Sequence, residues 1–336
     1  MAGRGRNRES ELVVAEIDRR LTRRMRYTTP LVRDERVHLV ASQLHALLQR
    51  GISVRPDIEQ ALCLREDLTA SVLEGFLRDE VRKVGFERVV FGLSGGIDSA
   101  LSAYLATRAL GREQVHAVLM PYRSSSPSSL ADAMEVVRDL NIPHTVVEIT
   151  GPIDAYFEQM DKLLGKQASP LRRGNRMARE RMVTLYDLSA AMNALVVGTS
   201  NKTELLLGYG TQFGDMASAI NPIGDLYKCQ VRQLSAYVGV PQSILNKAPS
   251  ADLWADQTDE KELGFTYDDA DEILYQWVDL RLSPDEIVER GYDESLVRHI
   301  VQRVQRNQYK RKPPIIAKLS GRTIGIDFRY LRDWGH

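Results

Sequence analysis

Short apolar runs alternate with segments of helical pattern along residues 67–198. The apolar runs cover residues 89–93, 115–120, 146–149 and 195–198, and helical patterns cover residues 69–84, 100–110, 129–140 and 179–192. Predominantly apolar runs are typical of strands buried on both faces, which occur where crossover helices cover a parallel sheet. The sequence therefore predicts an α/β fold with a doubly wound, mostly parallel sheet.

The segment before residue 68 has a different character. Residues 1–67 carry apolar positions at helical spacing among many Arg and Glu side chains. We expect two helices there, one before and one after residues 28–30. Their charges alternate in sign, which favours a solvated helical face over a nucleic-acid-binding arm. We therefore predict two parts, a helical N-terminal extension of residues 1–67 and a main domain of residues 68–336.

Charge and hydropathy argue against two classes of partner. Lys+Arg and Asp+Glu both number 45, so the chain has no net charge with which to hold nucleic acid. No stretch approaches the roughly 18 apolar residues of a membrane span, and the N-terminus lacks the apolar core of a signal peptide. Cys63 and Cys229 lie far apart, which argues against a disulfide framework and against a zinc site. We expect a cytoplasmic protein with neither a membrane nor a nucleic-acid partner.

A double glycine follows the first apolar run, in Ser94-Gly95-Gly96-Ile97-Asp98-Ser99. Ligands of parallel sheets bind beyond the carboxyl ends of the strands, where this loop is expected to lie. Tandem glycines let main-chain N–H groups turn toward one point, and the next helix adds the positive end of its dipole, so the loop suits a phosphate. Asp98 would repel a phosphate unless a divalent cation lay between them, which indicates Mg²⁺. A glycine turn with an Asp/Ser helix cap is the alternative.

The string SGGIDS after an apolar strand resembles the PP-loop of the ATP pyrophosphatases, which split ATP between its α and β phosphates. Later strings resemble the NAD synthetase family of that superfamily: GNRMARERM (174–182), GTSNKTE (198–204), NPIGDLYK (221–228), PSADLW (249–254) and YKRKPP (309–314). The resemblance runs from about residue 67 to residue 336 and implies an adenine nucleotide alpha hydrolase-like, Rossmann-like fold. It also implies a ligase that adenylates the carboxylate of deamido-NAD and replaces AMP with ammonia, giving NAD.

The resemblance implies roles for single residues. Asp98, Glu204 and Lys228 are implied to be catalytic, with Asp98 and Glu204 on Mg²⁺ and Lys228 on the ATP phosphates. The residues implied to bind ATP are Gly92, Leu93, Ser94, Gly95, Gly96, Ile97, Asp98, Ser99, Thr199, Lys228 and Ser250. The residues implied to bind deamido-NAD are Arg179, Gln212, Tyr309 and Lys310.

The same likeness implies ATP, deamido-NAD and ammonia as substrates, and a homodimer as the assembly. Glutamine-dependent relatives carry a glutaminase domain ahead of the PP-loop, whereas only some 90 residues precede it here, so free ammonia or a separate glutamine amidotransferase is expected to supply nitrogen. Gln212 and Ala219 stand where short bacterial members have Lys and Asp, so contacts around the nicotinamide ribose are expected to differ. Two alternatives stay open: another PP-loop ATP pyrophosphatase such as a tRNA-modifying enzyme, and a non-catalytic protein that binds nucleotides or nucleic acid.

Overall fold

The computed structural model describes residues 58–250 and 258–324. Its sheet has four parallel strands in the order β3-β2-β1-β4. The strands are β1 (Arg88–Gly92), β2 (Val115–Leu119), β3 (His144–Val146) and β4 (Ala194–Val196). The predicted α/β fold with a parallel sheet is confirmed. Because β2 and β4 flank β1 on opposite sides, the direction of winding reverses between β1 and β4, and such a switch point is where ligands of this fold class bind.

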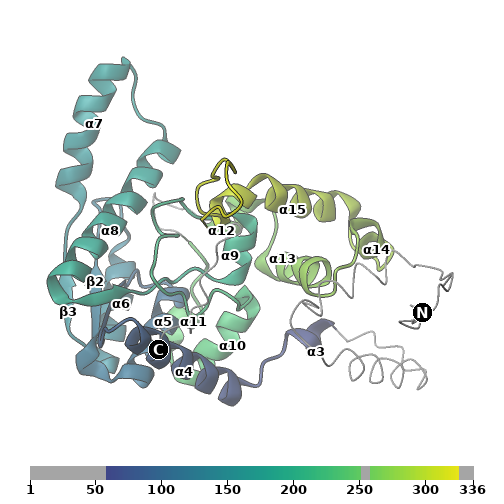
Figure 1. Ribbon diagram of the computed structural model, residues 1–336, viewed down its shortest axis with the longest axis horizontal. Helices are drawn as coiled ribbons and strands as arrows, with labels where there is room; N and C mark the ends of the chain where they lie inside the picture. Colours follow the sequence, from purple (N-terminus) through teal and green to yellow (C-terminus); the bar gives the residue numbers. More distant parts are fainter. Residues whose placement is uncertain (1–57, 251–257, 325–336) are drawn as a thin grey trace. The chain divides into compact units, whose positions relative to one another are not determined.

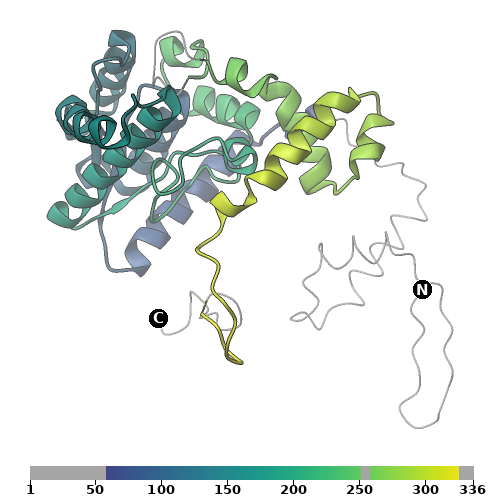
Figure 2. The ribbon, with the colours of Figure 1, turned by 90° about the horizontal axis from the view of Figure 1, so that it is seen from above.

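Helices connect and cover the strands (Figure 1). Up to β4 the helices are α3 (Ile58–Leu62), α4 (Glu66–Lys83), α5 (Ile97–Leu110), η1 (Arg112–Gln114), α6 (Pro127–Leu140), α7 (Thr150–Leu164) and α8 (Pro170–Met192). After β4 they are α9 (Lys202–Leu207), α10 (Lys228–Val238), α11 (Gln242–Leu245), α12 (Asp259–Leu263), α13 (Tyr267–Leu274), η2 (Tyr275–Asp279), α14 (Pro284–Val288), α15 (Glu294–Arg306) and η3 (Gln308–Arg311). Beyond η3 the chain runs without a helix to residue 324 (Figure 2).

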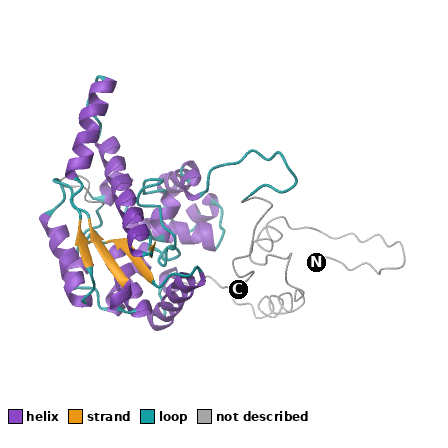
Figure 3. Ribbon diagram, turned by 60° about the vertical axis from the view of Figure 1, so that its left-hand side comes forward, coloured by secondary structure: helices purple, strands orange, loops and turns teal. Residues whose placement is uncertain are grey.

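Helices lie on both sides of the sheet (Figure 3), and successive strand residues face opposite layers. Val89 and Phe91 pack into one buried cluster with side chains of α4, α5, α6 and α10. Val90, between them, packs into a second cluster that contains residues of α7 and α8. All three side chains are fully buried. This two-sided burial explains why β1 is a continuous apolar run instead of an alternating one.

Several element boundaries differ from the prediction. The third strand was expected at residues 146–149, but β3 ends at Val146 and Ile149 lies buried before α7. The reason is that β3 is an edge strand without a buried residue, so the apolar run marks the start of the next helix instead. The helix expected to begin at Arg179 begins at Pro170, where Ser169 caps its first turn and proline occupies a position at which it costs no hydrogen bond.

The proposed N-terminal extension lies almost entirely outside the described residues, so its two helices and the boundary at residue 67 stay predictions. In the described part of the chain, no helix combines the length and apolar character needed to cross a membrane.

Candidate functional site

The glycine loop occupies the predicted place, between the carboxyl end of β1 and the first turn of α5. Its serine side chains brace it from within: the Ser94 hydroxyl accepts from the amide of Gly96 (3.2 Å), and the Ser99 hydroxyl donates to the Gly96 carbonyl (3.0 Å). The residue that precedes α5, Gly96, has no side chain with which to cap the helix. The first-turn amides of α5 therefore face the loop without a cap from that position, which suits an anion.

Gly95 meets two requirements that only glycine satisfies. Its φ angle of +79° lies in the left-handed region. A Cβ atom there would also lie 2.2 Å from the main-chain oxygen of Ser129 on α6. Gly96, in contrast, has an extended backbone with φ of −90°, and its nearest neighbour would be the Ser94 hydroxyl at 3.3 Å. The two glycines are therefore not equivalent, and Gly95 is the one that lets the loop approach α6.

Asp98, Glu204 and Lys228 come together beside this loop. Asp98 lies in the first turn of α5, Glu204 in the first turn of α9, and Lys228 is the first residue of α10. The Lys228 Nζ lies 2.5 Å from Asp98 Oδ2 and 3.2 Å from Glu204 Oε1. Because α5 follows β1 and α9 follows β4, the two carboxylates approach from opposite sides of the switch point. Their catalytic and metal-binding roles stay predictions.

Burial sets the electrostatics of this acid pair. Burial, followed by the charge of Asp98, raises the pKa of Glu204 to about 8, while the Lys228 ammonium opposes the shift. Burial disfavours the charged form of Lys228, whose side chain is 2% exposed, but Asp98 and Glu204 outweigh burial and raise its pKa above the ordinary value. The lysine is therefore a permanent cation held between two carboxyl groups.

Asn201 is part of this site although its role was not foreseen. It caps α9, because its Oδ1 accepts from the Glu204 amide (2.9 Å) while Glu204 Oε2 accepts from the Asn201 amide (3.3 Å). Its Nδ2 also donates to Asp98 Oδ1 (2.8 Å). The spacing Asn-x-x-Glu signals such a cap in the sequence. The contact with Asp98, 103 residues away, leaves no local signal.

The remaining residues predicted to bind ATP lie at the edges of the site. Thr199 is half-buried, three residues after the end of β4, and so follows the carboxyl end of a strand as Asp98 does. Ser250 is exposed and is the last described residue before residues 251–257.

The arginines at residues 173–181 do not converge on one point. The guanidinium of Arg173 lies 4.7 Å from the centre of the Phe157 ring, and that of Arg176 pairs with Glu180 at 2.5 Å. Arg179 Nη2 lies 3.4 Å from the main-chain oxygen of Gln212. Because α8 begins at Pro170, most of these arginines lie inside the helix and not at its positive end. These arginines therefore do not form a single anion-binding cluster at the start of α8.

Three of the four residues predicted to bind deamido-NAD lie around one loop. Arg179 contacts Gln212, as above, and Lys310 Nζ donates to the main-chain oxygens of Gly208 (2.8 Å) and Gly210 (2.9 Å). Lys310 thus ties the segment after α15 to residues 208–212. The fourth, Tyr309, is 56% exposed. These contacts define a shared neighbourhood, and binding of a dinucleotide there stays a prediction.

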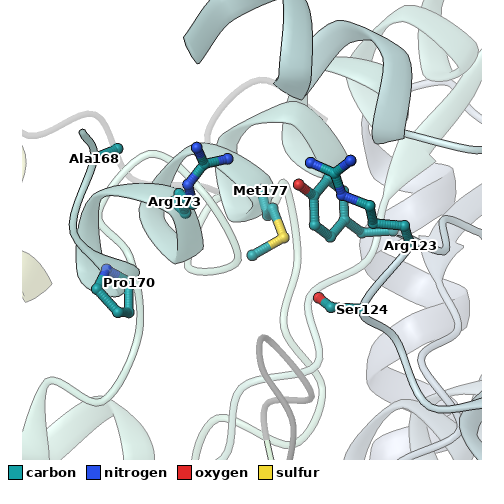
Figure 4. Close-up of a pocket in the computed structure, with 7 residues that line it drawn as sticks. Arg123, Ser124, Ala168, Pro170, Arg173 and Met177 are labelled. Atoms are coloured by element: carbon teal, nitrogen blue, oxygen red, sulfur yellow. The ribbon is translucent and has the colours of Figure 1, made fainter. Parts of the chain in front are cut away.

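A cavity of about 390 Å³ opens between the end of β2 and the start of α8 (Figure 4). It is lined by Tyr122, Arg123, Ser124, Ala168, Pro170, Arg173 and Met177. Two guanidiniums and the Ser124 hydroxyl lie among apolar and aromatic side chains. The Arg123 guanidinium pairs with Asp154 (2.7 Å), and that of Arg173 lies 3.8 Å from Asp161. Neither the acid pair nor Lys228 lines it. No short motif marks these residues, so sequence reasoning did not find the cavity.

Comparison with known proteins yields consistent matches. The family model described as NAD synthase matches residues 69–314. The NH(3)-dependent NAD(+) synthetase of Trichlorobacter lovleyi is 57% identical over 274 residues, which is 82% of this chain and 98% of that protein. Its counterpart from Chlorobium phaeovibrioides is 56% identical over 275 residues, with the same shares of the two chains covered.

Solved structures agree with these matches. The NH3-dependent NAD synthetase from Campylobacter jejuni, in complex with the nitrate ion, aligns with a TM-score of 0.64 and 37% identity over 76% of this chain and 100% of that chain. An NMN synthetase from Francisella tularensis aligns with a TM-score of 0.67 and 33% identity over 76% of this chain and 99% of that chain.

Proposed function

The chain belongs to the NAD synthase family, and from that premise we propose that it makes NAD from deamido-NAD, ATP and ammonia. The nicotinate carboxylate attacks the α-phosphorus of ATP, and pyrophosphate leaves. Ammonia then attacks the carbonyl carbon of the mixed anhydride, AMP leaves, and the nitrogen loses a proton to complete the amide. The matches do not favour the tRNA-modifying and nucleic-acid-binding alternatives.

The observation that carries this proposal is the meeting of Asp98, Glu204 and Lys228 at the switch point of the sheet. A glycine loop that can bind a phosphate lies directly beside them, since Asp98 is part of the loop's own helix. Splitting a triphosphate requires compensation of the charge that builds up on the departing pyrophosphate, and a preorganised ammonium supplies it without a proton transfer. Lys228, held as a cation by Asp98 and Glu204, is suited to this task.

The donor set fits Mg²⁺ as the accompanying metal. Among the described residues, His, Cys, Asp and Glu form no group of three or more that could hold a metal ion. Magnesium usually takes one or two carboxylates together with substrate phosphates and water, so the acid pair is sufficient. Asp98 Oδ2 (2.5 Å) and Glu204 Oε1 (3.2 Å) both lie close to Lys228 Nζ, so the two carboxyl groups are near enough to share one metal ion. When bound there, Mg²⁺ would neutralise the phosphate oxygens and polarise the phosphorus under attack.

The two substrates are assigned to different parts of the site. The glycine loop, Thr199 and Ser250 are proposed to hold ATP, and the cavity at the end of β2 offers room and cationic groups for part of a nucleotide. Arg179, Gln212, Tyr309 and Lys310 are proposed to bind deamido-NAD around the 208–212 loop.

The assembly and cellular location are also proposals. Helices α7 and α8 carry exposed apolar side chains, among them Leu163 (75% exposed), Leu171 (68%) and Val183 (52%). Such a surface supports a homodimer, because burying it in a second copy removes apolar area from water. Cys63 and Cys229 are both free thiols, in keeping with the reducing cytoplasm.

The test is a product assay with the purified full chain, Mg-ATP, deamido-NAD, and either ammonium or glutamine. We expect NAD, AMP and pyrophosphate in equal amounts with ammonium, and NAD from glutamine only when a separate amidotransferase is added. Replacing deamido-NAD with nicotinic acid mononucleotide tests the activity named for the Francisella protein. Absence of NAD with ammonium, or a clear preference for the mononucleotide, would overturn the proposal. Asp98→Asn serves as the matched inactive control.

A further inference from the structure

A buried carboxylate outside every motif lies behind the proposed catalytic groups. Asp271, on α13, is 1% exposed. Its Oδ2 accepts a hydrogen bond from the main-chain amide of Cys229 in the first turn of α10 (2.7 Å), and its Oδ1 accepts from the Thr203 hydroxyl on α9 (2.5 Å). It therefore contacts the two helices that carry Lys228 and Glu204, at the residues adjacent to them.

The Thr203 hydroxyl completes the connection. While it donates to Asp271, it accepts a hydrogen bond from the main-chain amide of Lys228 (3.0 Å). One carboxylate and one hydroxyl thus fix the start of α10 against the start of α9. The side chains of Lys228 and Glu204 extend from these same turns, so this buried pair links the main-chain positions of the two residues.

Burying the Asp271 carboxylate costs desolvation free energy. Among the ion pairs of the described residues, none involves Asp271, so hydrogen-bond donors and the positive end of α10 compensate its charge. Burial accordingly raises the pKa of Asp271 above its ordinary value, although the Thr203 and Cys229 bonds oppose the shift. A neutral side chain would avoid the desolvation cost of a buried charge.

We propose that Asp271 is a positioning residue for the amidation reaction, acting through Thr203 and the first turn of α10 to hold Lys228 at its working distance from Glu204. The inference rests on the proposed function, since it assumes that Lys228 stabilises the departing pyrophosphate. Asp271 itself lies outside the acid pair and touches neither of its members. Its loss displaces the ammonium and leaves the residues proposed to bind deamido-NAD in place.

The experiment compares Asp271→Asn, Thr203→Val and their combination with Thr203→Ser, which keeps the hydroxyl. Asp268→Asn, a change of the same kind at an exposed position of α13, is the matched control. We expect Asp271→Asn and Thr203→Val each to lower kcat by about a hundredfold, the effect of misplacing a catalytic group by about 1 Å. The KM for deamido-NAD should stay within about twofold, because none of the residues proposed to bind it is displaced. The double variant should be no slower than either single one, because both changes break one connection.

Thr203→Ser and Asp268→Asn should keep nearly full kcat. A purely structural role would lower the melting temperature and the active fraction while leaving kcat per active site intact, and that result would overturn the inference. Multiplying effects in the double variant would overturn it as well. If Asp271→Asn does not fold, the contrast between Thr203→Val and Thr203→Ser decides. A wild-type protein that makes no NAD refutes the proposed function instead, so the two failures are distinguishable.

Discussion

Replacing Gly95 by alanine should disable the glycine loop. An alanine at a φ of +79° costs about 1–2 kcal/mol, since left-handed backbone brings Cβ too close to the main chain. The new Cβ would also lie 2.2 Å from the Ser129 main-chain oxygen and 3.2 Å from its Cα. The clashing Ser129 atoms belong to the main chain of α6, so they cannot move aside by a side-chain rotation. Restoring an ordinary contact of 3.4 Å therefore requires the loop and α6 to separate by about 1 Å.

That displacement gives the expected magnitude. Moving a substrate-positioning loop by about 1 Å costs about a hundredfold in rate, or about 2.7 kcal/mol of transition-state stabilisation. The assay is kcat/KM for ATP in NAD formation, with the melting temperature measured beside it. Gly96→Ala is the matched control, because its backbone is extended and its nearest neighbour is the Ser94 hydroxyl, a group that can turn away. Equal losses in the two variants, or full activity in Gly95→Ala, would refute the reasoning.

Three further predictions concern other parts of the molecule. Lys228→Met leaves two carboxyl groups facing each other without their cation and should lower the free energy of unfolding by about 3 kcal/mol; an unchanged urea midpoint would contradict this. Arg311→Met removes three hydrogen bonds to main-chain oxygens of α9 and α15, so thermal unfolding should show a loss of about 2 kcal/mol, whereas the exposed Arg306→Met should show none. Burial, and then the neighbouring His144, lowers the pKa of His116, so the stability it contributes is present above the pKa of the unfolded chain and is lost as pH falls. Melting temperatures should therefore drop more steeply from about pH 7 to pH 5 in the wild type than in His116→Asn, and parallel curves would exclude this.

The fold could be predicted from the sequence because its strands are buried on both faces. Val89, Val90 and Phe91 have no solvent-facing position, so the run is apolar throughout and its parallel environment follows. The apolar pattern did not locate β3, because this edge strand has no buried residue. The apolar residues after it, Val147 and Ile149, pack in the segment that leads into α7. Helix α7 was not predicted at all, although its buried residues Ile153 and Phe157 have helical spacing. Two buried positions in fifteen residues are too few to mark a helix.

The proposed site was predicted unevenly. Asp98 was selected because it belongs to the glycine loop after a strand, and the family resemblance supplied Glu204 and Lys228. Asn201 lies between the selected residues Thr199 and Glu204 in the sequence. It was overlooked because its role as a helix cap is a sufficient local explanation for an asparagine at that position. Asp271 gave no signal, since a single acid on an amphipathic helix is ordinarily solvent-facing.

One physical reason explains why some site residues could be predicted from the sequence and others could not. The carboxyl ends of parallel strands meet at one edge of a sheet, so topology alone brings strand-end residues together whatever the details of packing. Glu204 therefore had to lie near Asp98 once β4 was placed beside β1. The position of α13 follows no such rule, because packing against α9, α10 and α15 locates the helix. Its contribution to the site is consequently visible only in three dimensions. Substitutions in that packing should change the rate through the distance between Lys228 and Glu204, even where they leave every motif residue in place.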